Sequence, residues 1–231
     1  MTEPADVLVI TPHPDDAEFG VAGTVAKWTR EGKQVVYVVC TNGNKGTSDP
    51  DVKPETLAEI RQNEQRAAAE ILGVREVVFL ENQDQGLEDT PEFRKQIVRM
   101  IRRYRPQTVV TADPYRRYIW HRDHRIAGQV TIDAVFPYAR DHLAFTDLLE
   151  EGLQPHKVKE MLFWASENIN FRSDITATFD LKLAALRCHE SQMKEMRFSD
   201  LEEWLRKRCR DLAEGENFEL AEAFHREEIF W

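Results

Sequence analysis

Short β-branched runs alternate with longer amphipathic runs through the first two-thirds of the chain, and this order restricts the fold to a narrow class. The alternation is typical of βαβ units built around a parallel sheet. We expect strands at Asp6–Thr11, Gln34–Thr41, Glu76–Leu80 and Gln107–Ala112. Apolar residues are consecutive rather than alternate in the first of them, from Val7 to Ile10. Such runs indicate strands that helices cover on both faces.

Helices are expected between these strands, and each ends at a residue that disfavours further helix. They are Ala17–Glu31 before Gly32, Pro54–Leu72 before Gly73, and Thr90–Tyr104 before Pro106. Glycine just past the end and proline shortly beyond it are the usual helix stop signals. The pattern loosens after Asp113, where we expect helices at His124–Arg140, Leu181–Met196 and Asp200–Ala213 and strands at Lys159–Trp164 and Ile175–Phe179.

Neither a Ser/Gly-rich linker nor a repeat period divides the chain, so a single domain over residues 1–231 is expected. The predicted fold class is α/β and Rossmann-like, a mostly parallel sheet flanked by helices with a C-terminal α/β elaboration. The formal charge of −10 makes nucleic acid and anionic membrane surfaces poor partners, because both are bound chiefly through Lys and Arg. Apolar runs are far shorter than the roughly 20 residues of a membrane span, and no signal peptide is recognisable, so a cytoplasmic location is expected.

Polar side chains gather in the turn after the first expected strand, which reads Thr-Pro-His-Pro-Asp-Asp from Thr11. Ligands of doubly wound sheets bind at the carboxyl ends of the strands, which is where this turn lies. Taken alone, however, Asp15 or Asp16 is better explained as the cap of the helix that follows. By the same argument His13 alone would be an ordinary loop histidine.

A second cluster, His121-Arg122-Asp123-His124, follows the fourth expected strand. Its presence favours a ligand site over a simple helix cap. Loops after parallel strands lie at the same edge of the sheet, so the two clusters are expected to meet. Catalytic zinc usually takes three His or carboxylate ligands and leaves one position for water, and His13, Asp16 and His124 would supply that set. Structural histidines and helix caps remain the alternative explanation at this point.

The other polar residues of the two clusters fit hydrolysis by such a zinc ion. Asp15 lies next to a ligand and would accept a proton from the attacking water. His121 would donate to the leaving group or to the oxyanion. Asp123 would orient His121 or His124.

Six short sequence blocks together resemble those of the LmbE/PIG-L family of zinc-dependent N-acetylglucosaminyl deacetylases. The resemblance is carried by His-Pro-Asp-Asp at 13–16, Glu-Phe-Gly at 18–20, Thr-Asn-Gly at 41–43, Arg-Gln-Asn-Glu at 61–64, His-x-Asp-His at 121–124 and His-Glu-Ser-Gln at 189–192. It implies that His13, Asp16 and His124 bind zinc, that Asp15 is the general base, and that His121 is the acid or oxyanion stabiliser.

Three further residues are candidate substrate contacts. The resemblance places Arg61 near the substrate, although a surface ion pair with Glu59 or Glu64 would also explain it. It also raises His189 from a packed or surface-bonded helical histidine to a residue that supports the site from behind or contacts a neighbouring subunit. Lys45 departs from the family pattern and would meet an anionic part of the substrate or stay solvated.

The expected function is therefore removal of an acetyl group from an N-acetylated amino sugar of the GlcNAc type. One Zn²⁺ per chain is the expected cofactor, although His₂Asp ligation also accepts other divalent transition metals. The expected partner is a small amino-sugar conjugate, with a homo-oligomer possible. The alternatives are an amidase of thiol conjugates, a hydratase of an unsaturated dicarboxylate, and a metal-binding protein without catalysis. A nucleotide site is disfavoured because no GxGxxG or GxxxxGK[ST] follows an expected strand.

Overall fold

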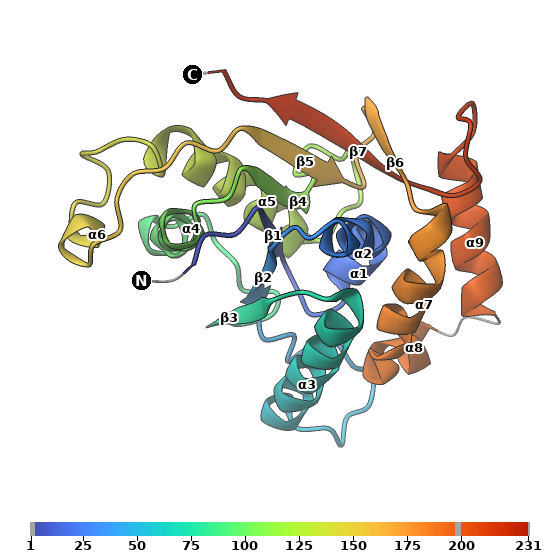
Figure 1. The fold of residues 1–231 in the computed structure, drawn as a ribbon. Helices are drawn as coiled ribbons and strands as arrows, with labels where there is room; N and C mark the ends of the chain where they lie inside the picture. Colours follow the sequence, from blue (N-terminus) through green and yellow to red (C-terminus); the bar gives the residue numbers. More distant parts are fainter. Residues whose placement is uncertain (1–2, 197–199, 231) are drawn as a thin grey trace.

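A computed structural model describes residues 3–196 and 200–230, and within these ranges the strands form one seven-stranded sheet (Figure 1). The strand order is β3-β2-β1-β4-β5-β7-β6. Their bounds are β1 Val7–Thr11, β2 Val35–Thr41, β3 Glu76–Asn82, β4 Thr108–Ala112, β5 Glu160–Trp164, β6 Phe171–Asp174 and β7 Ala221–Glu228. The strands β1 to β5 pair in parallel, and β7 pairs antiparallel with both β5 and β6. The expected mostly parallel α/β fold is confirmed.

Helices connect the parallel strands and cover both faces of the sheet. Their bounds are α1 Asp16–Gly20, α2 Ala22–Arg30, α3 Pro54–Leu72, α4 Pro91–Tyr104, α5 Arg122–Asp133, α6 Asp147–Glu150, α7 Phe179–Arg187, α8 Glu190–Met196 and α9 Leu201–Leu212. Two of the stop signals act as expected, since Gly32 follows the end of α2 and Gly73 ends α3, both in the left-handed conformation (φ 87° and 72°). At its start, α4 is capped by the Thr90 side chain, which accepts from the Phe93 amide.

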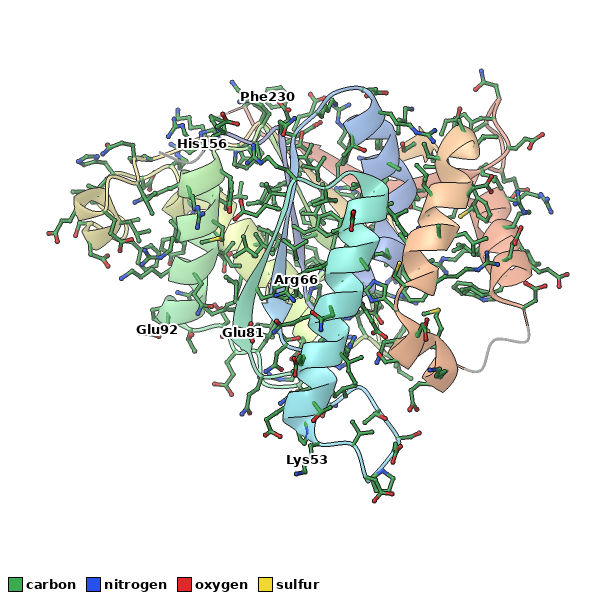
Figure 2. The ribbon with its side chains drawn as sticks, turned by 60° about the horizontal axis from the view of Figure 1, so that its bottom comes forward. Lys53, Arg66, Glu81, Glu92, His156 and Phe230 are labelled. Carbon is green, nitrogen blue, oxygen red and sulfur yellow. The ribbon has the colours of Figure 1, made fainter. Side chains whose placement is uncertain are left out.

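Two of the three buried apolar clusters lie on the two faces of the sheet, and the third lies among α7, α9 and the residues before β7. In β1, Leu8 and Ile10 belong to the cluster shared with α4 and α5. Val7 and Val9 belong to the cluster shared with α2 and α3. Figure 2 shows the strands between α4 on one side and α2, α3 and α7 on the other. Burial on both faces explains why the strands carry consecutive apolar residues.

Three expected helices are shorter than the sequence pattern suggests. The first is divided at Val21, whose φ of −144° separates α1 from α2. The helix expected from His124 ends at Asp133 and continues as a short π-helix, Ala134–Tyr138, which contains Pro137. The third is divided between α7 and α8, at Cys188 and His189. Periodicity alone detects none of these breaks because the apolar spacing continues across them.

The C-terminal strands are where the sequence-based prediction fails. The stretch Ile175–Phe179 was expected to be a strand, but Thr176–Thr178 is a 3₁₀ turn leading into α7. The Asp174 carboxylate accepts from the Thr176 amide and hydroxyl and so ends β6 before this stretch. The strand β7 was not expected at all, since its sequence, AEAFHREE, is rich in charge.

Among the described helices, none is both long and apolar enough to cross a bilayer.

Gly128 provides a test of how α5 docks on the sheet. A Cβ at this position would lie 2.4 Å from the Ala112 carbonyl oxygen and 2.9 Å from Pro114 Cδ. Helix propensity alone would favour alanine here by about 1 kcal/mol. The clash of this Cβ with the Ala112 carbonyl outweighs the propensity of alanine for helix. Gly128→Ala should therefore lower the free energy of unfolding in urea by about 2 kcal/mol. The neighbouring Gln129→Ala should change it by less than about 0.5 kcal/mol. Equal stability of Gly128→Ala and wild type would contradict the packing described.

Candidate metal centre

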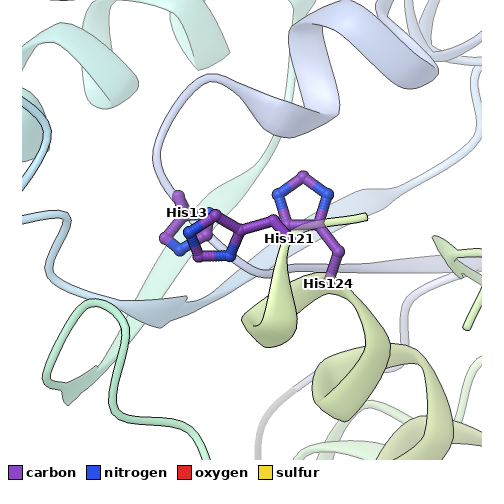
Figure 3. A group of neighbouring side chains, drawn as sticks. All are labelled: His13, His121 and His124. Carbon is purple, nitrogen blue, oxygen red and sulfur yellow. The ribbon is translucent and has the colours of Figure 1, made fainter. Parts of the chain in front are cut away.

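The loops after β1 and β4 bring three histidines together at the carboxyl edge of the sheet (Figure 3). His13 follows β1, and His121 and His124 lie at the start of α5. The His13 ring centroid lies 4.7 Å from that of His121 and 5.3 Å from that of His124. The strand order reverses direction between β1 and β4, which is the position where doubly wound sheets bind ligands. The expected meeting of the two clusters is confirmed.

The three predicted zinc ligands converge on one carboxylate oxygen. Asp16 Oδ2 lies 2.9 Å from His13 Nδ1 and 3.1 Å from His124 Nε2. Ligand atoms about 2.1 Å from a tetrahedral ion are separated by about 3.4 Å, which is close to this spacing. Two imidazoles and a carboxylate are also the donor types that zinc prefers. The residues present therefore fit a metal ion.

A second group of donors surrounds the other nitrogen of His13. His13 Nε2 lies 3.1 Å from both Asp84 Oδ1 and Asp123 Oδ2. Donor atoms of His13, Asp84, His121 and Asp123 all lie within 4.8 Å of one another, as do those of His13, His121 and His124. A metal ion thus has more than one donor set within reach, and the assignment of His13, Asp16 and His124 as ligands stays a prediction.

Asp123 was expected to orient His121 or His124. Among the described residues its carboxylate forms no hydrogen bond or ion pair with either, although a donor atom of His121 lies within 4.8 Å of it. Instead it bonds to His13 and accepts from the backbone amides of Gln85 (2.7 Å) and Leu87 (3.3 Å). Asp123 is fully buried, so these donors replace water around its charge. The Asp123 side chain therefore orients His13, in the cluster after β1, rather than a histidine of the cluster after β4.

The electrostatics of the cluster favour a cation at its centre. Burial lowers the pKa of His13, but hydrogen bonds to Asp123, Asp16 and Asp84 outweigh it and hold that pKa well above the ordinary value. The pKa of Asp16 is well below its usual range, because attraction and hydrogen bonds to His124 and His13 outweigh burial. Without a metal, a proton on His13 supplies the positive charge that the carboxylates require. A bound cation would supply the same charge.

Asp15 lies beside the ligand group with an unusual backbone. Its φ of 96° is left-handed, a conformation that non-glycine residues rarely adopt. Its amide donates to Gln65 Oε1 at 3.0 Å, and its Oδ2 lies 3.5 Å from Arg61 Nη2. Burial raises the pKa of Asp15 to about 6, against the attraction of Arg61, which lowers it. The carboxylate is thus positioned next to the metal centre and held by other contacts.

Arg61 is buried, so the alternative of a surface ion pair with Glu59 or Glu64 is wrong. It donates to the carbonyls of Gly43 at 2.9 Å and Pro14 at 2.6 Å. A Cβ on Gly43 or Gly46 would lie within 2.6 Å of Arg61 Nη1. The glycines of this loop therefore let it close over the guanidinium.

His121 caps α5 and lies at the mouth of the site. Its Nδ1 accepts from the Asp123 amide at 3.1 Å. Burial lowers the pKa of His121, and the charges of His13 and His124 lower it further. Since Nδ1 accepts, the proton of the neutral ring lies on Nε2, which makes Nε2 a hydrogen-bond donor.

The other two candidate substrate contacts differ in exposure. The Lys45 side chain is exposed, and its backbone amide donates to Asp84 Oδ2 at 3.3 Å. His189 is fully buried, with Nε2 3.3 Å from Glu18 Oε2, and Glu18 in turn accepts from Gln65 Nε2 at 2.9 Å. His189 thus joins a buried chain that leads to Asp15. Substrate contact by Lys45, Arg61 and His189 stays a prediction.

Sequence reasoning missed three residues of this site, Asp84, Gln65 and Glu18. Asp84 follows β3, so the rule that placed the other loops at the sheet edge would have found it. Gln65 lies four residues after Arg61 on α3, the spacing that places two side chains on one helix face. Only the fold shows that Glu18 is buried between Gln65 and His189.

Comparison with known proteins places the chain among deacetylases. The family described as PIG-L: GlcNAc-PI de-N-acetylase matches residues 8–135. The diacetylchitobiose deacetylase of Thermococcus kodakarensis is 41% identical over 189 residues, which cover 82% of this chain and 70% of that protein. A probable N-acetyl-α-D-glucosaminyl L-malate deacetylase 2 of Bacillus anthracis is 29% identical and covers 80% of each chain.

A solved structure agrees with the sequence relatives. The N,N′-diacetylchitobiose deacetylase of Pyrococcus horikoshii, solved with its inhibitor MPG, superposes with a TM-score of 0.91 at 32% identity. The match covers 97% of this chain and 84% of that one.

Gln65 provides a test of how the Asp15 backbone is held. In Gln65→Leu the Asp15 amide and the Glu18 carboxylate each lose a partner in a buried position. Leaving buried polar groups unpaired should lower the free energy of unfolding by about 2 kcal/mol. Gln62→Leu on the same helix removes an exposed hydrogen bond to Glu81 and should cost less than about 0.5 kcal/mol. Urea unfolding measures both, and equal values would show that Gln65 does not support Asp15.

Proposed function

The chain belongs to the PIG-L family of GlcNAc-PI de-N-acetylases, and from that membership we propose that it removes an acetyl group from an amino-sugar conjugate by zinc-dependent hydrolysis. It is a hydrolytic enzyme, a deacetylase of N-acetylglucosamine-type substrates. We further propose that the metal is zinc and that Asp15 and His121 act directly in the reaction. A second observation supports a cation there, because carboxylate oxygens of Asp16, Asp84 and Asp123 each lie within 3.1 Å of a ring nitrogen of His13.

One geometric observation carries the proposed ligand set. A single oxygen of Asp16 lies within 3.1 Å of a nitrogen of His13 and of His124, and these residues come from loops more than 100 positions apart. Zinc held by the three would polarise the amide carbonyl and lower the pKa of water to about 7.

Asp15 is proposed as the general base. Its carboxylate is next to the ligands, and the Arg61 guanidinium favours its charged form. As the water oxygen bonds to the amide carbon, the water's proton goes to Asp15. Cleavage of the carbon–nitrogen bond then releases acetate, and the same proton goes to the departing amine.

His121 is proposed to stabilise the oxyanion. Its ring lies at the mouth of the site with Nδ1 occupied by the Asp123 amide, so Nε2–H is available to donate. A donor of this kind strengthens its hydrogen bond as negative charge develops on the carbonyl oxygen. Arg61 would serve mainly by holding Asp15 and the loop at Gly43, with Lys45 nearest to the solvent-exposed part of the substrate.

His124 tests the metal site. His124→Ala should abolish stoichiometric zinc binding and acetate release, because one of three ligands is lost. His142→Ala, which removes an exposed histidine outside the cluster, should leave both unchanged. Metal content per chain, measured by mass spectrometry beside an acetate assay on small GlcNAc derivatives, checks the expectation. Zinc bound normally by His124→Ala would overturn the ligand assignment.

The same acetate assay separates the proposal from its alternatives. Bound zinc without acetate from any GlcNAc derivative, together with cleavage of a thiol-conjugate amide or hydration of an unsaturated dicarboxylate, would move the activity to that reaction.

Asp15 tests the base separately from the metal. Asp15→Ala should keep one zinc per chain and lower kcat by about 10²- to 10⁴-fold, since removing the base affects proton transfer and leaves the ligands in place. Turnover is measured with stoichiometric zinc, so weakened metal affinity cannot mimic the effect. Full turnover by Asp15→Ala would show that the base lies elsewhere.

A further inference from the structure

The loop at Gly43, which connects β2 to α3, lies against the first turn of α8. Gln192 Nε2 donates to the Gly46 carbonyl oxygen at 2.9 Å. The Gln192 side chain is buried, and a Cβ on Gly46 would lie 3.0 Å from its Oε1. The same Cβ would lie 2.5 Å from Arg61 Nη1. The loop is thus packed closely against both α8 and the buried guanidinium.

The next turn of α8 holds the outer part of this loop. Glu195 Oε1 accepts from the Thr47 hydroxyl at 3.0 Å, and Glu195 Oε2 accepts from the Ser48 hydroxyl at 2.7 Å. Thr47 Oγ1 also accepts from the Asp49 amide, which keeps the following turn compact. Side chains of α8 therefore bond to three consecutive loop residues, 46 to 48.

Contacts with α3 and with the sheet fix α8 itself. Glu64 on α3 accepts from the Ser191 amide at 2.8 Å and from the Ser191 hydroxyl at 2.7 Å. Figures 1 and 2 both show α8 beside α3. The preceding helix, α7, is tied to β7 by the buried ion pair of Lys182 with Glu222, at 2.6 Å. The helix α8 is therefore a fixed support to which the loop is attached.

The loop also contacts the metal centre through its backbone. The Gly43 carbonyl accepts from Arg61, and the Lys45 amide donates to Asp84. Arg61 lies 3.5 Å from Asp15, and Asp84 belongs to the second group of donors. The Lys45 side chain is exposed at this position. The contacts that hold the loop therefore determine where Lys45 lies relative to the site.

We propose that α8 is a latch that holds the loop at Gly43 beside the metal centre, and that Gln192 is a positioning residue for substrate binding. Gln192 acts through Gly46 rather than on the reacting groups. A loop that is already held in its binding conformation loses less entropy when a ligand binds, so the latch strengthens binding. This inference rests on the proposed deacetylase function, since the ligand is the amino-sugar conjugate.

Hydrogen exchange tests the latch without any reaction. The leucine in Gln192→Leu is similar in size to glutamine and cannot donate to Gly46. In the zinc-loaded full-length protein, the amides of residues 44–49 should exchange about tenfold faster in this variant, because the loop opens without unfolding the sheet. Zinc content should stay at the wild-type value. Gln62→Leu makes the same change on α3, where the side chain bonds to Glu81, and should leave the exchange of the loop unchanged.

A second pair of variants leaves the helices unchanged. Thr47→Val with Ser48→Ala removes both hydroxyls that donate to Glu195, and the loop should again exchange faster, by about threefold. Thr47→Ser with Ser48→Thr keeps both hydroxyls and should exchange as wild type does. Thr47 is half-buried and Ser48 is exposed, so these variants keep the fold even if Gln192→Leu does not.

Binding and turnover test the positioning role. For methyl N-acetyl-β-D-glucosaminide, Gln192→Leu should raise KM about fivefold and leave kcat within about twofold, because binding is weakened while the proposed ligands and base remain. The Kd of the same glycoside, measured by calorimetry, should rise about fivefold when Gln192→Leu is added to Asp15→Ala, which is expected to retain zinc without rapid turnover. Gln62→Leu should change neither KM nor Kd.

The outcomes distinguish this inference from the proposed function. Unchanged loop exchange in Gln192→Leu and in Thr47→Val with Ser48→Ala overturns the latch. Faster exchange without weaker binding, or a loss of kcat at unchanged KM, overturns the positioning role of Gln192. Faster loop exchange and a higher Kd, in the absence of any acetate release by wild type, support the latch and overturn only the deacetylase proposal.

Discussion

Four carboxylates lie at one edge of the sheet, and the structure around them is arranged to hold that negative charge. Asp16 and Asp123 lie in the first turns of α1 and α5, where the helix dipole favours an anion. Asp84 and Asp123 take the Nε2 side of His13, whereas Asp16 takes the Nδ1 side. Asp15 has the buried guanidinium of Arg61 as its counter-charge. The separation divides the site into three carboxylates that surround His13 and one, that of Asp15, that faces an arginine.

Polar contacts connect this site to α3 and to the junction of α7 and α8. Gln65 on α3 holds the Asp15 amide, and its own amide group bonds to Glu18 on α1. Glu18 lies against His189, which stands between α7 and α8. Side chains of α3, α1 and the α7–α8 junction therefore support the left-handed backbone of Asp15. This explains why a turn with an unfavourable φ persists next to the reacting groups.

The sequence predicted most reliably what short-range patterns determine. Parallel strands followed from consecutive β-branched residues, and helix ends such as those at Gly32 and Gly73 followed from local backbone chemistry. The sequence-based prediction failed where contacts between residues distant in the chain determine the structure. The charged strand β7 is stable because it pairs with β5 and β6, and the Asp123 carboxylate bonds to His13, 110 residues away, rather than to a histidine of its own cluster. The meeting of the two His/Asp clusters was predictable because a parallel sheet places the ends of its strands along one edge.

The ion pair between Lys182 and Glu222 has a consequence for how the protein is made. Glu222, on the last strand, accepts from the amides at the start of α2, about 200 positions earlier in the chain. Until that strand leaves the ribosome, Lys182 has no counter-charge and the α1–α2 junction has no acceptor. During synthesis, a chain that already carries both His/Asp clusters therefore still lacks the acceptor for the amides at the start of α2.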